Sequence, residues 1–137
     1  PLWINMYTSA IANGGKLMKP EIVKQDPQAL GTISFDDDTW RVVREGMRQT
    51  ITDGTGQLLK DIPQAVAAKT GTSQIAGGKA LNSLFTVYGP YDPSVGEAGN
   101  PQISMTILVE NIPQGQSLAV QVAKEFLSWY FGAYAYK

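Results

Sequence analysis

The chain has 137 residues, 43% of them hydrophobic, which is enough for one domain with a buried core. Lys and Arg number 11 against 12 Asp and Glu, so the formal net charge is −1. No basic cluster could follow a phosphate backbone, which argues against nucleic acid as a partner. The absence of histidine and cysteine excludes disulfides, thiol nucleophiles, Ser-His dyads and the usual zinc sites. Chemistry must therefore use Ser, Thr, Tyr, Lys or carboxylates.

The first part of the chain predicts a helix over residues 2–13. Its apolar stripe of helical spacing consists of Trp3, Tyr7, Ala10 and Ile11. Asn13-Gly14-Gly15 then supplies a left-handed stop. Residues 19–24 contain a proline and two β-branched residues, which predicts a short edge strand, and residues 25–32 are the most plausible hinge.

A second helix is predicted over residues 36–52. Ser34, followed three residues later by an acid, is typical of a helix start, and the acids at 36–38 complement the helix dipole better than they indicate a cation site. The expected buried stripe consists of Trp40, Val43, Met47, Thr50 and Ile51. Asp53-Gly54-Thr55-Gly56 ends the helix, and a short helical turn is expected around Leu58 and Leu59.

The period then changes to that of strands, which are predicted over 66–72, 84–88 and 102–109. Loops join them, so we expect an antiparallel meander of about three strands and an α+β fold. A last helix over 116–131 should cover one face of the sheet through Leu118, Val122, Phe126 and Tyr130. Burial is also the simpler interpretation of the aromatic residues near the C-terminus.

The segment Lys69-Thr70-Gly71-Thr72 follows the apolar run 65–68. In isolation it could be the end of any strand. Its surroundings, however, resemble the C-terminal part of the transpeptidase domain of penicillin-binding proteins, most closely the class B type, in which K-T-G is one of three active-site motifs. Two further phrases of that family are Ile11-Ala12-Asn13-Gly14-Gly15-Lys16-Leu17 with Lys19-Pro20, and Gly54-Thr55-Gly56. The resemblance covers about residues 2–131.

The chemistry of these residues suits such a site. A lysine on a rigid strand offers a fixed positive charge that can anchor a substrate carboxylate and orient nearby hydroxyls, which is the role expected of Lys69. Gly71 would let a substrate backbone approach the strand edge. The resemblance implies that Thr72 gives its backbone N–H to an oxyanion hole and helps bind the carboxylate. Thr70 is expected in the substrate-binding segment together with Lys69, Gly71 and Thr72, but its side chain should point away, with a packing role and a minor polar contact.

The other two motifs of the family are absent from this sequence. None of the serines is followed by Lys three positions later or by Asn two positions later. The sequence therefore supplies no nucleophile, and we expect residues 1–137 to be the C-terminal part of a domain whose serine lies upstream. The strand after K-T-G also departs from the family pattern of Trp-Phe followed by Val-Gly, since it reads Leu84-Phe85-Thr86-Val87-Tyr88-Gly89.

The resemblance implies a parent enzyme that cross-links peptidoglycan stem peptides by serine acyl transfer, binds β-lactams, uses no metal or organic cofactor and works on the extracytoplasmic side of the membrane. Two alternatives remain: a non-catalytic scaffold or binding module, and a β-lactamase or β-lactam sensor of the same fold. The chain alone should be inactive. It should also expose an edge and an apolar face that the rest of the domain would cover, which predicts self-association.

Overall fold

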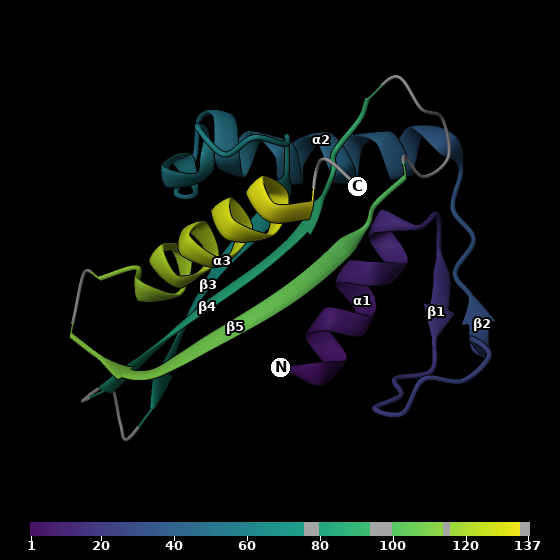
Figure 1. The fold of residues 1–137 in the computed structure, drawn as a ribbon, viewed down its shortest axis with the longest axis horizontal. Helices are drawn as coiled ribbons and strands as arrows, with labels where there is room; N and C mark the ends of the chain where they lie inside the picture. The colour runs from purple at the N-terminus through teal and green to yellow at the C-terminus, as the bar shows by residue number, and fades with distance from the viewer. Residues whose placement is uncertain (76–79, 94–99, 114–115, 135–137) are drawn as a thin grey trace.

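The computed structural model describes residues 1–75, 80–93, 100–113 and 116–134. They form an α+β fold in which helices pack on a small sheet, with a separate β-hairpin beside the first helix (Figure 1). The elements in chain order are α1 (Leu2–Ala12), β1 (Lys16–Met18), β2 (Ala29–Thr32), α2 (Asp37–Thr52), the 3-10 turn η1 (Gln57–Leu59), β3 (Ala67–Ile75), β4 (Ala80–Gly89), β5 (Ile103–Ile112) and α3 (Leu118–Tyr134). Within the described ranges, no helix has the length and apolar character needed to cross a bilayer.

The main sheet has the order β3-β4-β5 and is antiparallel throughout, which confirms the predicted meander. Each strand is longer than predicted. The β3–β4 ladder runs from the Ala67–Tyr88 pair to the Ile75–Ala80 pair. The extra pairs involve polar residues such as Ser73 and Asn82, whose backbones pair although their side chains carry no strand signal. The glycines at 77 and 78, expected in this connection, lie outside the described residues.

The two faces of the sheet support different helices. Val66, Ala68, Phe85 and Val87 alternate toward the face that α3 covers, as predicted for the last helix, and the turn η1 closes this core. Ala67 and Tyr88 point to the opposite face, where they pack with Ala12 of α1 and Met47 of α2. In Figure 1, α3 lies across the strands and α1 lies beside β5. The residues of β3 between Ala67 and Thr72 therefore alternate between an α3 face and an α1 face.

The predicted contact stripe of α3 is only partly correct: Tyr130 is partly buried and packs against the core, but Val122 and Phe126 do not. The residues that seal the core are Ala119, Val120, Ala123, Leu127 and Phe131, each at most 3% exposed. In contrast, Val122 is 48% exposed and Phe126 is 38% exposed. The helix carries two adjacent apolar stripes, and periodicity alone cannot tell which one meets the sheet. Trp129, expected to be buried with the other aromatic residues, is also exposed.

The N-terminal predictions need three corrections. Helix α1 buries Met6, Thr8, Ala10 and Ala12, whereas Trp3 and Tyr7 of the predicted stripe are 65% and 51% exposed. The segment 19–24 is not a strand but part of the connection between β1 and β2, and the predicted hinge contains β2.

Asn13 and the two glycines explain where β1 begins. The Asn13 side chain accepts from Lys16 N at 2.8 Å and donates to Lys16 O at 2.9 Å, which fixes the chain just after α1. Gly14 and Gly15 have φ of 81° and 98°, as the predicted left-handed stop requires. Strand geometry therefore starts at Lys16, before Pro20 is reached.

Helix α2 lies close to its predicted limits, but its cap is Asp36, not Ser34. The Asp36 side chain accepts from Thr39 N at 2.8 Å, and this hydrogen bond lowers the pKa of the carboxyl below its usual value. Trp40, Met47 and Ile51 are buried as predicted, whereas Val43 is 40% exposed. Asp36 thus caps the helix, and Asp37 and Asp38 lie in its first turn, where they complement the helix dipole as predicted.

Candidate active site

The segment Lys69–Thr72 lies on β3, which has β4 on one side and no strand on the other within the described part of the chain. The strand enters the core at Val66, Ala67 and Ala68, all fully buried, and becomes accessible at the motif. Lys69 and Thr72 are exposed, and Thr70 and Gly71 are half-buried. Along such an edge, alternate backbone N–H and C=O groups point away from the neighbouring strand and are free to pair with an extended peptide.

Lys69 projects from the face of the sheet that α1 shares. Its neighbour two positions earlier, Ala67, packs against α1 and α2 on that face. The Lys69 ammonium donates to the carbonyl oxygen of Thr70 at 2.7 Å, and the side chain is otherwise exposed. The cation is therefore held at the strand edge, where an anionic ligand could approach it.

Thr70 points to the opposite face, as predicted, and makes a specific polar contact. Its Oγ1 lies 2.7 Å from Oγ1 of Thr55 in the loop after α2. The glycines beside Thr55 fit too closely for side chains, because a Cβ at Gly54 would lie 2.9 Å from Thr50 Cα and one at Gly56 would lie 2.8 Å from Ile51 Cδ1. The phrase Gly54-Thr55-Gly56 thus fixes one hydroxyl against the K-T-G strand.

Among the described residues, packing does not require a glycine at position 71. A Cβ at this position would meet only the side chain of Leu84, at 3.5 Å, which is ordinary van der Waals contact. The space above Gly71 is therefore open. This agrees with a glycine whose purpose is to admit a ligand backbone.

Sequence reasoning missed Arg48, which anchors the start of β3. The Arg48 guanidinium donates to the carbonyl oxygen of Val66 at 2.7 Å and lies over the ring of Tyr91, 5.9 Å from its centroid. A charged donor to a strand carbonyl fixes the end of the strand that leads into Lys69. The helical spacing of Arg44 and Arg48 was a signal that they share one face of α2, but it gave no indication of what they contact.

Tyr88 is also on the α1 face, yet its hydroxyl is a poor candidate for acid–base chemistry. It is 3% exposed, and the oxygen has no hydrogen-bond partner among the described residues. Burial raises the pKa of this hydroxyl well above its usual value. Tyr88 therefore remains protonated and serves the packing between α1 and the sheet.

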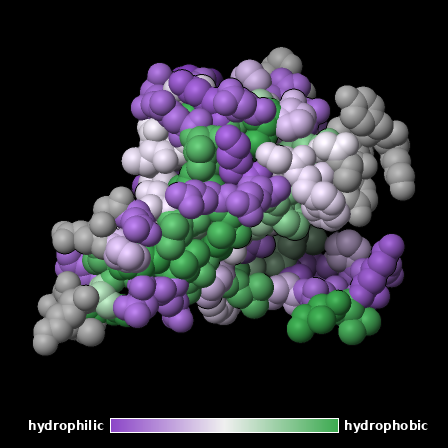
Figure 2. Space-filling view, turned by 60° about the vertical axis from the view of Figure 1, so that its left-hand side comes forward, coloured by the Kyte–Doolittle hydropathy of each residue, from purple (hydrophilic) through white to green (hydrophobic). Residues whose placement is uncertain are grey.

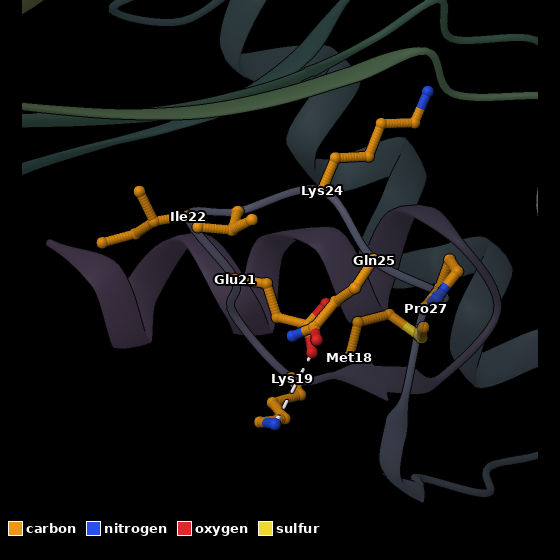
Figure 3. A pocket seen from close by; sticks show the side chains of 8 residues that line it. Met18, Lys19, Glu21, Ile22, Lys24, Gln25 and Pro27 are labelled. Carbon is orange, nitrogen blue, oxygen red and sulfur yellow. Dashed lines mark ion pairs between the residues drawn. The ribbon is translucent and has the colours of Figure 1, made fainter.

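A concave region lies in the loop between β1 and β2 (Figure 3). It encloses about 450 Å³ and is lined by residues that include Met18, Glu21, Gln25 and Pro27. Glu21 Oε1 pairs with Lys19 Nζ at 3.6 Å, and the side chain of Lys24 points away from the loop in this view. None of the residues that line this hollow belongs to Lys69–Thr72, and none was predicted as a site residue.

Comparison with known proteins agrees with the geometry. The family model described as penicillin binding protein transpeptidase domain matches residues 1–128. Penicillin-binding protein 2A of Bacillus subtilis is 28% identical over 163 residues, covering 96% of this chain and 22% of the relative. Peptidoglycan D,D-transpeptidase MrdA of Acinetobacter baumannii is 30% identical over 155 residues, covering 95% of this chain and 22% of the relative. The chain thus spans about a fifth of the length of these relatives.

The fold is likewise similar to solved structures of this kind. Penicillin-binding protein 2B of Streptococcus pneumoniae superposes with a TM-score of 0.79 at 18% identity, over 100% of this chain and 25% of that one. The D,D-transpeptidase domain of a peptidoglycan glycosyltransferase from Eggerthella lenta superposes with a TM-score of 0.75 at 23% identity, over 96% and 32%.

Proposed function

Because the chain belongs to the penicillin-binding protein transpeptidase domain family, we propose that it forms the K-T-G wall of a peptidoglycan D,D-transpeptidase active site. The observation that carries the proposal is the position of Lys69–Thr72 on an accessible edge of β3, with the cation, the open space above Gly71 and a strand edge without a neighbouring strand in one segment. An extended peptide ending in a carboxylate is the ligand that this combination suits best.

Each residue of the segment has a role in the proposal. Lys69 binds the substrate carboxylate and orients the reacting hydroxyls. Gly71 admits the substrate backbone, and the backbone N–H of Thr72 contributes to the oxyanion hole. Thr70 belongs to the substrate-binding segment, and its side chain keeps the strand in place through Thr55.

The nucleophile is a serine outside residues 1–137, since no serine of this sequence lies in an S-x-x-K or S-x-N motif. Its oxygen attacks the carbonyl of the D-Ala-D-Ala peptide bond, and the terminal D-Ala leaves as the amine. An amino group of a second stem peptide then attacks the acyl-enzyme and releases the serine. The chain without that serine is inactive, and β-lactams acylate the same oxygen in the complete domain.

The proposal extends to the setting of the complete protein. Two curated relatives carry the name peptidoglycan D,D-transpeptidase, so we place the parent on the extracytoplasmic side of a bacterial membrane, acting on stem peptides. The remaining part of the same domain is a necessary partner. A penicillin-binding protein of Helicobacter pylori, 27% identical, is described in complex with MreC. We extend the proposal to a similar complex of the parent protein with such a partner.

The test is acylation of the complete protein by a labelled penicillin, followed by peptide mapping. We expect the adduct on a serine upstream of Pro1 and none on the 137-residue chain. Lys69→Met should reduce the rate of acylation by at least a hundredfold, about the value of a catalytic electrostatic contact. Lys60→Met, which removes an exposed lysine near η1, serves as the matched control and should react normally.

The alternatives make different predictions in the same experiment. A folded protein that forms no adduct would support the scaffold interpretation. An adduct that hydrolyses rapidly would indicate a β-lactamase. Labelling of the 137-residue chain itself would show that the nucleophile has been misplaced.

A further inference from the structure

A row of polar side chains crosses the sheet at the position of Lys69. In the β3–β4 register Lys69 is opposite Thr86, and in the β4–β5 register Thr86 is opposite Thr106. Residues directly opposite on neighbouring strands share a face, with their Cβ atoms about 5 Å apart. Lys69, Thr86 and Thr106 therefore form one row on the α1 face.

Thr86 is the centre of a hydroxyl network that joins this row to α1. Its Oγ1 lies 2.6 Å from Oγ1 of Thr8 and 2.9 Å from Oγ1 of Thr106. On α1, Asn5 Oδ1 lies 3.5 Å from Oγ1 of Thr106 at the end of this network, and it accepts a separate hydrogen bond from Ser104 at 2.9 Å. Thr8 and Thr86 are 3% and 8% exposed, so these contacts are shielded from water.

The direction of the hydrogen bonds follows from the donor inventory. Thr8 donates its hydroxyl proton to the carbonyl oxygen of Ile4 at 2.9 Å, so in its contact with Thr86 it is the acceptor. Thr86 then donates to Thr8, since its alternative acceptor, the carbonyl of Met105, is farther away at 3.3 Å. The Thr86 oxygen is left as an acceptor for Thr106, whose alternative acceptor, Asn5 Oδ1, is farther away at 3.5 Å.

This arrangement couples the position of α1 to the strand row that carries Lys69. Helix α1 makes apolar contacts with the sheet near Ala12. In the row that contains Lys69, its contact with the sheet is the polar one between Thr8 and Thr86. Hydrogen bonds are directional, so they fix the helix along the strands more narrowly than apolar packing does. Thr86 is also part of the strand segment in which this chain departs from its family pattern, and that segment was not assigned a role by the sequence.

We propose that Thr86 is a positioning residue for Lys69: through its hydrogen bonds to Thr8 of α1 and Thr106 of β5 it fixes both elements to β4 beside the lysine and so determines where the ammonium group lies. The expected effect of Thr86 on acylation rests on the proposed function. The expected effect of Thr86 on the location of the Lys69 ammonium group does not depend on whether the complete protein reacts with penicillin.

The experiment uses the complete transpeptidase domain with its lysines dimethylated with ¹³C. The Lys69 methyl resonance is assigned from its loss in Lys69→Arg, and acylation by a penicillin is measured in parallel. We expect Thr86→Val to shift the Lys69 resonance and to reduce the acylation rate constant at saturating penicillin roughly two- to tenfold, the size of one or two neutral hydrogen bonds. Thr86→Ser retains the hydroxyl and should restore both.

Ser104→Ala is the matched control. It removes a hydrogen bond between the same helix and the same sheet, but from β5 and outside the Lys69 row. It should leave the Lys69 resonance and the rate constant unchanged. An unchanged Lys69 resonance in Thr86→Val, or an equal shift in Ser104→Ala, would overturn the proposal. A wild-type domain that forms no adduct would contradict the proposed function, and the resonance alone would then decide the role of Thr86.

Discussion

The hydroxyl of Thr55 lies 2.7 Å from the hydroxyl of Thr70 and joins the loop after α2 to the strand that carries Lys69. These residues are 15 positions apart, and each belongs to a Gly-containing phrase that is also typical of the family. The contact gives the first phrase, Gly54-Thr55-Gly56, a physical role: it supports the second.

We expect the contact to be measurable as a coupling. Thr55→Val and Thr70→Val should each reduce the free energy of unfolding by about 1 kcal/mol or less, because one partly exposed hydrogen bond is lost. The double variant should be no worse than the less stable single variant, and chemical denaturation measures all three. Fully additive effects would show that the two hydroxyls do not interact in solution.

Gly71 and Gly89 should respond differently to alanine. A Cβ at Gly71 is accommodated at 3.5 Å from Leu84, so Gly71→Ala should change stability by about 0.5 kcal/mol or less, yet impair acylation of the complete domain. A Cβ at Gly89 would lie 2.8 Å from Val66 Cγ1, so Gly89→Ala should cost about 1–3 kcal/mol by overpacking. Thermal denaturation and penicillin labelling separate the two effects. Normal acylation in Gly71→Ala would contradict the proposed approach of substrate at this residue.

Arg48 should be a strong contributor to stability. Replacement by Met keeps the aliphatic stem but removes the donor to the carbonyl of Val66, and we expect a loss of about 2 kcal/mol, typical of a hydrogen bond to a charged group. Arg48→Lys is the control, since a lysine keeps the charge but lacks the planar fork, and its loss should be intermediate. Urea denaturation measures both, and equal stability of all three proteins would contradict the anchoring role.

The Asp36 cap makes stability depend on pH. The pKa of Asp36 is lower in the folded chain than in the unfolded chain, so the unfolded chain binds a proton more readily. The cap therefore contributes its full stability at a pH above the pKa of the unfolded state. It loses this contribution as the pH falls through the pKa of the folded state. Asp36→Ala should lower the melting temperature at pH 7. The difference from wild type should shrink below about pH 4, where the carboxyl takes up its proton. A difference that does not change with pH would mean that the carboxylate form is not what caps α2.

The 137-residue chain should self-associate in solution. Apolar side chains gather in a band on one face of the molecule (Figure 2). Among the described residues, Val122 and Phe126 of α3 are exposed, and an apolar helix surface of this kind promotes association. Sedimentation should show a mass that rises with concentration, and Val122→Lys should reduce it. Gln121→Lys adds the same charge at an adjacent exposed position and should have less effect. A concentration-independent monomer would contradict this prediction.

Much of the fold could be predicted because the signals are local. The glycine stop after α1, the acids at the start of α2 and the change of period at residue 65 each act over a few residues, and the elements they predict are present. The errors arise where a local signal has two solutions. Helix α3 has two apolar stripes, and the sheet selected the one that contains Leu127 instead of Phe126.

The sequence by itself determined the helices α1, α2 and α3, the antiparallel meander and the segment Lys69–Thr72, because each depends on residue types close together in the chain, but it did not predict the β1–β2 hairpin. The tertiary structure decided which residues face one another: Thr55 with Thr70, Arg48 with Val66, and Thr86 between Lys69 and α1. These contacts depend on strand register and helix rotation. A shift of one residue in a strand reverses every side chain, and only the packing of the whole chain excludes that shift.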